Sequence, residues 1–297
     1  MSCNKSFLNP TTGCNEDLGL PKQLILVKNT FKFATTTLAQ ELANWKAGIY
    51  SKDLYILPLL ASVEANNTEA VYEDTPWSKY KVKDGIMGFK VMYDAGIDLN
   101  TSLQSFDTSG ELGVYIAFES GVILGYKNSN TGEVRGFSCN FINPENYQFN
   151  LGTSRGKTVM TVSFKDAREF NNWPAVIIPE NGVIAWDYTD LEALKTVKLE
   201  VVTATATKVT FKAYLNHVAN EAGVKIAVLG LVAGDFALTK TDGSAQTITT
   251  LSTTAGVDGQ YEANGTALVS GFLTMKTPAL ATTKGYEVLA PVTVTVV

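Results

Sequence analysis

The clearest pattern of apolar and polar positions runs from Gly110 to Phe170, where apolar residues recur at every second position. Side chains two residues apart lie on the same face of a β-strand, so this alternation predicts strands with one core-facing side. Turn residues at Glu119–Gly121 and Asn128–Gly132 predict chain reversals. We expect a β-meander, because three or four strands with an apolar face can hold a fold in water. The core-facing residues of its successive strands are Leu112, Val114, Ile116 and Phe118; Val122, Leu124 and Tyr126; Phe137, Cys139 and Phe141; and Met160, Val162 and Phe164.

A helix is predicted ahead of the meander. Thr37 stands three residues before Gln40, which is the spacing of a capping box, and Gly48 is a stop signal. We expect this helix to lie against the sheet with Trp45 facing the core, because a tryptophan on an apolar stripe is far more often core than a ligand platform. The apolar residues at helical intervals are Leu38, Leu42, Trp45 and Ile49.

Two shorter helices are expected further along the chain. Residues 98–106 have helical composition, with Asp98 or Asn100 as the capping residue. Residues 166–173 form the other, which ends before Pro174 because a residue preceding proline disfavours the helical conformation.

Further strands are expected on either side of the meander. The apolar run 54–60 contains Pro58, which cannot donate to a strand ladder, so it indicates an edge strand or the end of a strand. Residues 81–93 and 176–186 also have strand composition.

The first 30 residues are polar and punctuated by proline and glycine, which predicts an extended N-terminal arm. Twenty extended residues span about 60 Å, enough to cross onto a neighbouring subunit. A disordered tail is the alternative interpretation.

An acidic run follows the first helix. Residues 62–74 contain four carboxylates, and no cation occurs before Lys79. A solvated loop presenting negative charge and a cluster of Ca²⁺ ligands are the two interpretations. The plain loop is favoured, because calcium loops need closely spaced oxygens around a glycine turn.

The composition changes near Asp190. From Thr196 onward aromatic residues become rare, threonine and alanine become frequent, and short alternating strands such as Val197–Val201, Val209–Leu215 and Val292–Val296 recur. With turn signals at Asp242–Gly243 and Asp258–Gly259, this predicts an immunoglobulin-like β-sandwich. The expected organisation is an arm over 1–30, a β-sandwich assembly domain with a flanking helix over 31–190, and an Ig-like domain over 191–297.

Charge and cysteine content narrow the function classes. The chain has 24 Lys+Arg and 29 Asp+Glu, a net charge of -5, so it has no long-range attraction for nucleic acid. Cys3, Cys14 and Cys139 are widely spaced, which argues against a disulfide framework and a zinc site. Met1–Lys5 lacks the apolar core of a secretion signal and no run has the length of a membrane span, so we expect a protein made and kept in a cytoplasm.

Three features of the chain are candidates for catalytic chemistry: the lone histidine, a glycine-containing segment and two pairs of carboxylates. His217 is the only histidine and is expected in an exposed loop, so no histidine-based triad or zinc site is predicted. Gly152–Thr158 looks like the end of a phosphate-binding loop, but its first glycine is one residue too close and it leads into a strand instead of a helix. The carboxylate pairs Asp166–Glu169 and Glu64–Glu69 are no more distinctive than any surface pair. We therefore expect a non-enzymatic protein with no catalytic, cofactor-binding or metal-binding residues.

The predicted layout consists of an arm, a capped helix, a β-meander with long acidic loops and a C-terminal Ig-like domain. This layout resembles that of the major tail (tail tube) proteins of long-tailed bacteriophages. The likeness covers both domains as architecture and includes no short motif, so it assigns no site residue. It implies a virion protein that joins its sheet with those of its neighbours into hexameric rings. The rings stack into a tube, through which DNA passes without specific binding.

The resemblance also implies where contacts lie. The arm and residues 62–79 are candidate contacts between rings, acidic loops suit a lumen that must not bind DNA, and residues 191–297 decorate the outside. Other virion proteins are the remaining partners, and a membrane is not among them.

Two alternatives remain open. One is a capsid decoration or head-associated virion protein that presents the Ig-like domain as an outward knob. The other is a carbohydrate-binding adhesive β-protein, in which Trp77, Tyr80 and Trp186 would stack on sugars.

Overall fold

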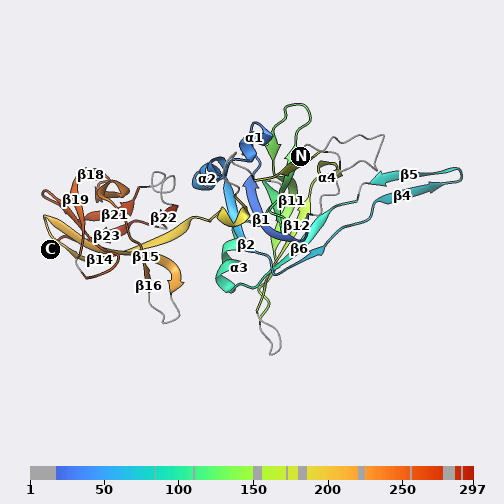
Figure 1. The fold of residues 1–297 in the computed structure, drawn as a ribbon. Coiled ribbons are helices and arrows are strands. Elements are labelled where there is room, and N and C mark those ends of the chain that lie inside the picture. The colour runs from blue at the N-terminus through green and yellow to red at the C-terminus, as the bar shows by residue number, and fades with distance from the viewer. Residues whose placement is uncertain are drawn as a thin grey trace. The chain divides into compact units, whose positions relative to one another are not determined.

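The structure is a computed structural model that describes residues 18–83, 85–109, 111–149, 156–171, 173–179, 186–219, 225–254, 256–276, 285–288 and 290–297. The fold is mainly β, as the alternation predicts. Figure 1 shows its elements. The described residues form two compact units, the first within Met1–Gly48 and Asp53–Leu191 and the second within Ile49–Lys52 and Glu192–Val297.

The first unit is built from strands with a few short helices. The helical segments are α1 Thr36–Ala39, α2 Leu42–Tyr50, α3 Ile97–Gln104, α4 Arg168–Asn171 and the 3-10 turn η2 Tyr188–Asp190. The strands are β1 Pro21–Lys28, β2 Leu54–Leu59, β3 Ser62–Ala65, β4 Val71–Thr75, β5 Ser78–Lys83, β6 Gly88–Tyr93, β7 Thr108–Ser109, β8 Leu112–Phe118, β9 Ile123–Lys127, β10 Val134–Arg135, β11 Phe137–Pro144, β12 Thr158–Phe164 and β13 Pro174–Ile177.

Two sheets share strand β11 and enclose the main core of this unit. The path of paired strands is β10-β9-β8-β11-β12-β6-β3, with β1 between β8 and β2, and β13 beside β9. Buried residues of β1 and β8, such as Leu26 and Val114, belong to the same core cluster as Val91 of β6 and Val162 of β12. The first unit is therefore a β-sandwich with short flanking helices.

The meander is present with a different strand order. The hairpin β8–β9 and the reversal before β10 occur where the turn residues predict them, with positive φ at Gly121 and Gly132. However, β11 pairs with β8 through Phe137 and Val114 instead of extending the meander beyond β10. Sequence alternation specifies faces but not neighbours, because the partner of a strand depends on contacts far apart in the chain.

The prediction of one apolar face for β8 is wrong, because all seven of its residues are buried. The second face is covered by α2, in which the centroid of the Trp45 ring lies 4.9 Å from that of the Tyr115 ring. In β11 a bulge between Cys139 and Phe141 changes the side-chain alternation. Phe137 and Cys139 are buried as predicted, while Phe141 is partly exposed.

The N-terminal arm is the largest error in the predicted fold. Residues 1–17 lie outside the described residues, but Pro21–Lys28 forms strand β1, which pairs with β2 on one side and β8 on the other. The continuous apolar run Leu24–Val27 is buried completely, as is typical of a strand covered on both faces. The flanking proline and glycine residues masked this strand signal.

The predicted first helix is split. Thr35, instead of Thr37, accepts the capping hydrogen bond of α1, from the Leu38 N–H, and α2 starts at Leu42 and continues past Gly48 to Tyr50. The inward position of Trp45 is confirmed, because this side chain is fully buried.

The remaining elements follow the predictions with shifted ends. Helices α3 and α4 are confirmed, although the N-cap of α3 is Gly96. Strand β2 pairs only with β1 and is an edge strand, as Pro58 predicts. The run 81–93 contributes to two strands, β5 and β6. Of the strand expected over 176–186, β13 includes only Val176 and Ile177, and residues 180–185 lie outside the described residues.

The second unit is also a β-sandwich, as predicted. One sheet has the order β19-β20-β15-β14-β22 with β16 beside β15, and the other has the order β18-β17-β21-β23. Phe211 and Tyr261 of the first sheet and Phe236 and Leu273 of the second share one core. The elements are β14 Lys195–Ala204, β15 Lys208–Ala219, β16 Lys225–Ala227, η3 Ala233–Asp235, β17 Phe236–Lys240, β18 Ala245–Gln246, β19 Ile248–Thr253, β20 Gln260–Gly265, β21 Gly271–Met275, β22 Tyr286–Val288 and β23 Val292–Val294.

Turns of the second unit occur where the sequence predicts them. Gly243 and Gly259 both have positive φ, at the predicted Asp-Gly turns. Within the described part of the chain, no helix is long and apolar enough to cross a membrane.

Candidate self-association surface

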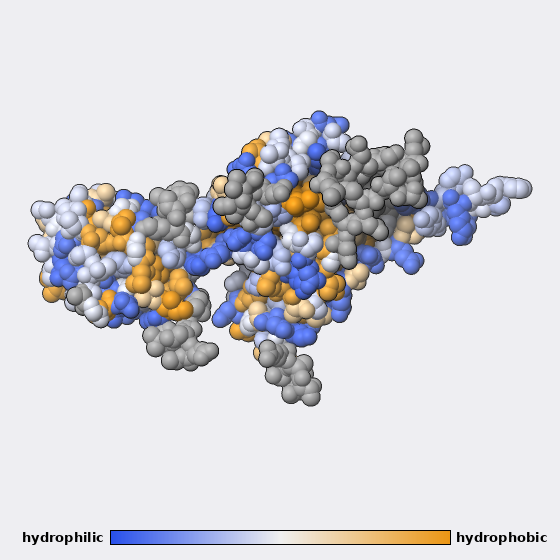
Figure 2. All heavy atoms as spheres, in the orientation of Figure 1, coloured by the Kyte–Doolittle hydropathy of each residue, from blue (hydrophilic) through white to orange (hydrophobic). Residues whose placement is uncertain are grey.

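A two-stranded hairpin projects from the first unit and is the most distinctive feature of its surface (Figure 1). Strands β4 and β5 pair with each other and form a separate sheet. All five residues of β4 are exposed, so neither face of the hairpin covers a core. In the space-filling view the hairpin is a thin extension coloured white to blue, as expected for charged and aromatic residues (Figure 2).

The end of the hairpin is a tight turn at Pro76 and Trp77. Thr75 Oγ1 accepts a hydrogen bond from the Ser78 N–H at 3.2 Å and lies 2.8 Å from the Ser78 carbonyl oxygen, to which it donates. Pro76 follows the common preference for proline early in such turns, because its φ is fixed near the required value. The turn therefore holds Trp77 at the tip, where 94% of its surface is exposed.

The hairpin carries large apolar side chains that nothing in its own chain covers. Five of them are between 53% and 94% exposed, and they lie along both strands and at the tip: Val71, Tyr72, Trp77, Tyr80 and Val82. An isolated two-stranded hairpin is marginal in water, and exposed aromatic residues are enriched where proteins bind one another. The surface of residues 71–83, here called the hairpin arm, is the candidate interaction surface.

The segment predicted as an acidic loop thus contains strands β3 and β4, and in the hairpin β4–β5 one of its carboxylates, Asp74, faces a lysine. Asp74 lies opposite Lys79, with 3.3 Å between carboxylate and ammonium, and Tyr72 lies opposite Lys81. The acidic run ends where an alternating lysine run begins, at Lys79, Lys81 and Lys83. That alternation after Pro76 was the sequence signal for a second strand. The hairpin therefore carries both signs of charge, instead of the negative charge alone that the acidic run predicts.

The base of the hairpin arm is tied to the sandwich. The Thr68 N–H donates to the Ile86 carbonyl oxygen at 2.8 Å, and the Ile86 N–H donates to Thr68 Oγ1 at 2.9 Å. Beyond them, β3 pairs with β6 in the main sheet. The arm is therefore a continuation of two adjacent segments of the sandwich.

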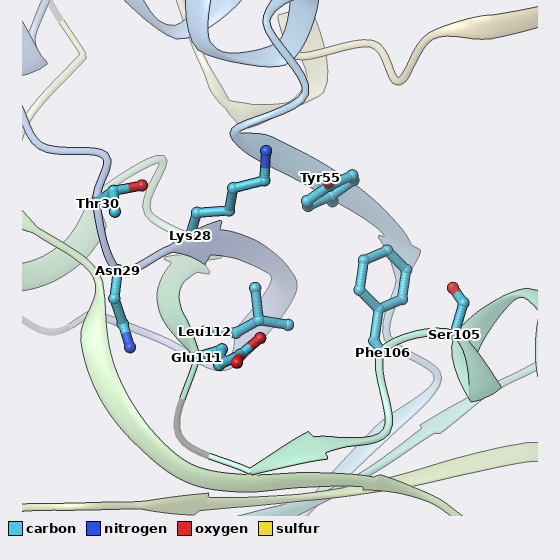
Figure 3. Close-up of a pocket in the computed structure, with 8 residues that line it drawn as sticks. All are labelled: Lys28, Asn29, Thr30, Tyr55, Ser105, Phe106, Glu111 and Leu112. Carbon is cyan, nitrogen blue, oxygen red and sulfur yellow. The ribbon is translucent and has the colours of Figure 1, made fainter.

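A pocket of about 680 Å³ opens on the same unit, at the ends of β1 and β8 and beside α3 (Figure 3). Its walls are mainly apolar: the Tyr55 and Phe106 rings meet edge to face with 4.9 Å between centroids, and Leu112 lies beside them. Lys28 and Glu111 give the rim one cation and one anion, and the Lys28 ammonium is 3.0 Å from Asp53. Pockets of this size and composition accept apolar or aromatic groups.

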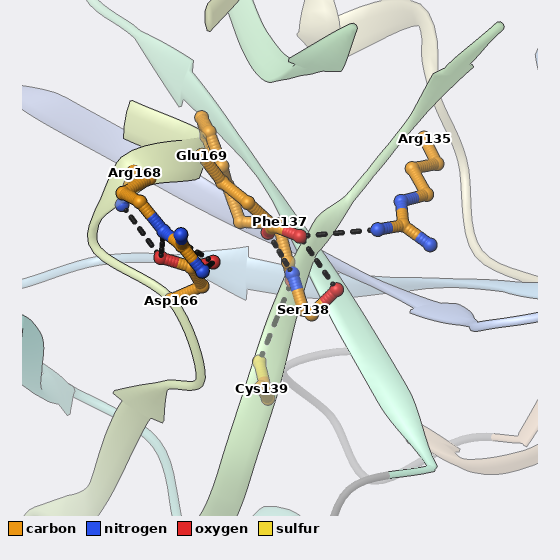
Figure 4. Close-up of polar contacts among 7 residues, drawn as sticks. All are labelled: Arg135, Phe137, Ser138, Cys139, Asp166, Arg168 and Glu169. Atoms are coloured by element: carbon orange, nitrogen blue, oxygen red, sulfur yellow. Dashed lines mark hydrogen bonds and ion pairs between the residues drawn. The ribbon is translucent and has the colours of Figure 1, made fainter. Parts of the chain in front are cut away.

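A second pocket, of about 690 Å³, contains both members of the predicted carboxylate pair Asp166 and Glu169. Each carboxylate is bound to an arginine (Figure 4). Asp166 accepts from the Arg168 guanidinium at 2.8 Å, and this hydrogen bond lowers the pKa of the Asp166 carboxyl. Glu169 is buried and accepts from Arg135 at 3.1 Å and from the Ser138 N–H at 2.7 Å. These bonds hold α4 to β10 and β11, which is a structural role.

The other candidate residues are not brought together with them. His217 lies in strand β15 instead of a loop, and its side chain is outside the described residues. In the segment 152–158, which resembles the end of a phosphate-binding loop, residues 152–155 lie outside the described residues. Thr158 begins strand β12, as predicted. Glu64, in strand β3, lies opposite Lys90 of strand β6. Groups of three or more histidine, cysteine or acidic residues suited to a metal ion do not occur in the described ranges.

The structure describes one of the three cysteines and all three of the aromatic residues named as candidates for stacking on sugars. Cys139 is a buried free thiol whose pKa is raised by burial and by the neighbouring Glu169 carboxylate, while Cys3 and Cys14 lie outside the described residues. Trp77 and Tyr80 are exposed, but Trp186 is buried and donates from Nε1 to the Gln40 carbonyl oxygen at 2.7 Å. Trp186 is therefore part of the core and has no face for a sugar.

Comparison with known proteins assigns no family. The sequence matches no protein-family model, and it has no significant match among curated proteins.

Proposed function

We propose that the protein is a non-enzymatic structural protein that assembles with copies of itself, as the tail-tube subunit of a long-tailed bacteriophage. The observation that carries the proposal is the hairpin arm, with exposed apolar residues on a strand pair that has no core of its own. A surface of this kind is stabilised when another molecule covers it. A second copy of the chain is the partner that is always present at the site of assembly.

Other features agree with an assembling role. Among the described residues, β3 pairs with β6 alone and β2 pairs with β1 alone. These sheet edges present backbone groups that a neighbouring sheet can extend. In the proposal, such edges join subunits into rings, the rings are hexameric, and the hairpin arm connects one ring to the next. The net charge of -5 suits a conduit through which DNA passes without specific binding.

The test compares the wild-type chain with a variant lacking the hairpin arm. Because Thr68 and Ile86 are already hydrogen-bonded across the base, residues 69–85 can be replaced by Asn-Gly, a favoured two-residue hairpin turn. Solution mass over a concentration series and negative-stain microscopy give the readout. We expect rings or tubes for the wild type and smaller species for the variant, with unchanged unfolding of the sandwich.

A wild-type chain that stays monomeric at every concentration would overturn the proposal. The exposed Trp77 and Tyr80 favour a carbohydrate-binding adhesive protein as the second candidate. In that case a glycan array would detect binding that is lost in a Trp77→Ala variant, without any assembly.

A further inference from the structure

The tip of the hairpin arm has the properties of an anchor residue. Trp77 is held by a turn that the Thr75 hydroxyl closes, so its position is set before any partner arrives. Tryptophan is among the residues that contribute most binding energy when they enter a pocket on a partner. A rigid anchor also loses little conformational freedom on binding.

The pocket beside α3 has the complementary properties. Tyr55 and Phe106 already form an edge-to-face pair, and a third ring can extend such a cluster at the same favoured separations. The volume of about 680 Å³ leaves room for the Pro76–Trp77 turn as well as the indole. Figure 3 shows the Tyr55 and Phe106 rings next to each other among the residues that line the pocket.

A charge near the tip can match a charge on the rim. Asp74 and Lys79 face each other just behind the turn, and both are exposed. The pocket presents Lys28 and Glu111. Lys28 keeps its partner Asp53 at 3.0 Å, so Glu111 is the rim charge that Lys79 of an entering tip can approach, beside an apolar centre.

The two surfaces lie on different parts of the same unit. In Figure 1 the turn between β4 and β5 points away from β1, β2 and α3, so a chain does not fill its own pocket. A contact between the tip of one copy and the pocket of the next is heterologous, and such contacts repeat from copy to copy.

We propose that the Pro76–Trp77 turn of one copy enters this pocket of another copy and packs against the Tyr55–Phe106 pair, and that this contact links successive copies of the chain. The inference rests on the proposed self-assembly and names the docking site of the hairpin arm. The occupant is a second copy of this chain, because its tip supplies both the aromatic ring and the matching charge.

The test is a disulfide between two different chains. Cys3 and Cys14 are first changed to serine, and Cys139 is left because it is buried. One chain then carries Ser78→Cys, next to the intact Trp77 at the tip, and the other carries Ser105→Cys, which lies on the pocket wall. We expect a disulfide-linked heterodimer in the mixture under mild oxidation. The matched control replaces Ser105→Cys by Ser129→Cys, at an exposed turn that does not line the pocket, and should give no specific product.

A second measurement separates this inference from the proposed function. Trp77→Ala should raise the concentration needed for assembly at least tenfold, Trp77→Phe should raise it less, and Ser105→Trp should block the pocket in the acceptor chain. If the wild type assembles, Trp77→Ala assembles equally well and the two cysteine variants form no disulfide with each other, the docking site is wrong while the self-assembly proposal stands. If the wild type does not assemble, both are wrong.

Discussion

Strand β8 and the hairpin arm are both β-structure, and β8 and β5 both have apolar residues at alternate positions, yet the two regions have opposite environments. All seven residues of β8 are buried, between β1 and the shared strand β11 and under Trp45. All five residues of β4 are exposed, and its only strand partner is β5. The comparison shows that alternation indicates a strand, whereas burial depends on what the rest of the chain places against it.

The difference has an energetic meaning. Side chains of β8 contribute to the stability of the first unit when it folds, because they leave water at that moment. Side chains of the hairpin arm can contribute only when another molecule covers them. Matched substitutions in the two regions should therefore separate folding from association.

The largest difference is expected for two tryptophans. Trp45→Ala should reduce the free energy of unfolding of the first unit by about 3–5 kcal/mol, because a fully buried ring and its contacts with Tyr115 are lost. Trp77→Ala should change it by less than about 0.5 kcal/mol. Urea denaturation of the monomeric chain, followed by tryptophan fluorescence, checks both values. Equal losses would mean that the hairpin arm is part of the folded core.

The next comparison is between two carboxylates, the buried Glu169 and the exposed Asp74. Glu169→Ala should destabilise the first unit by about 2 kcal/mol, because the partly buried Ser138 N–H loses its acceptor and Arg135 loses its partner. Asp74→Ala breaks only the exposed pair with Lys79 and should cost below about 0.5 kcal/mol. Thermal unfolding of both variants beside the wild type gives the comparison. A small effect at Glu169 would contradict the structural role of its network.

The buried core, and not the hairpin arm, should make the stability of the folded chain depend on pH. Burial raises the pKa of the Cys139 thiol above its ordinary value of 9.0, so the folded chain keeps the proton that the unfolded chain releases. The unfolded state then binds fewer protons, and stability is lost as the pH rises above 9, by up to about 1.4 kcal/mol per pH unit.

The control for this effect is Cys139→Ala. In that variant the alkaline loss should begin nearer pH 10, the ordinary pKa value of Tyr93 and Tyr115, whose hydroxyl pKa values burial also raises. Chemical denaturation at a series of pH values gives the two profiles. Identical profiles for the variant and the wild type would rule out the thiol as the source.

Several features of the candidate site were accessible from the sequence, and others were not. The sequence points to residues 62–79 as a candidate contact, but the run 81–93 predicts a single strand and so separates Lys81 and Lys83 from the hairpin arm. The pocket was not predicted, because Tyr55, Phe106 and Leu112 come from three separate segments. Glu169 was named only as one of many acids, and its burial became visible once β10, β11 and α4 were in place.

The sequence by itself determined the local features: the β class of both units, the inward Trp45, the edge strand at Pro58, and the turns at Gly132 and Gly243, where positive φ favours glycine. These depend on side-chain period and backbone preference over a few residues. Only the tertiary structure decided that Leu24–Val27 is an inner strand, that β11 pairs with β8, and that β4 and β5 pair outside the core. Strand partners and the covering of a second face arise from contacts between distant segments, which no local pattern encodes.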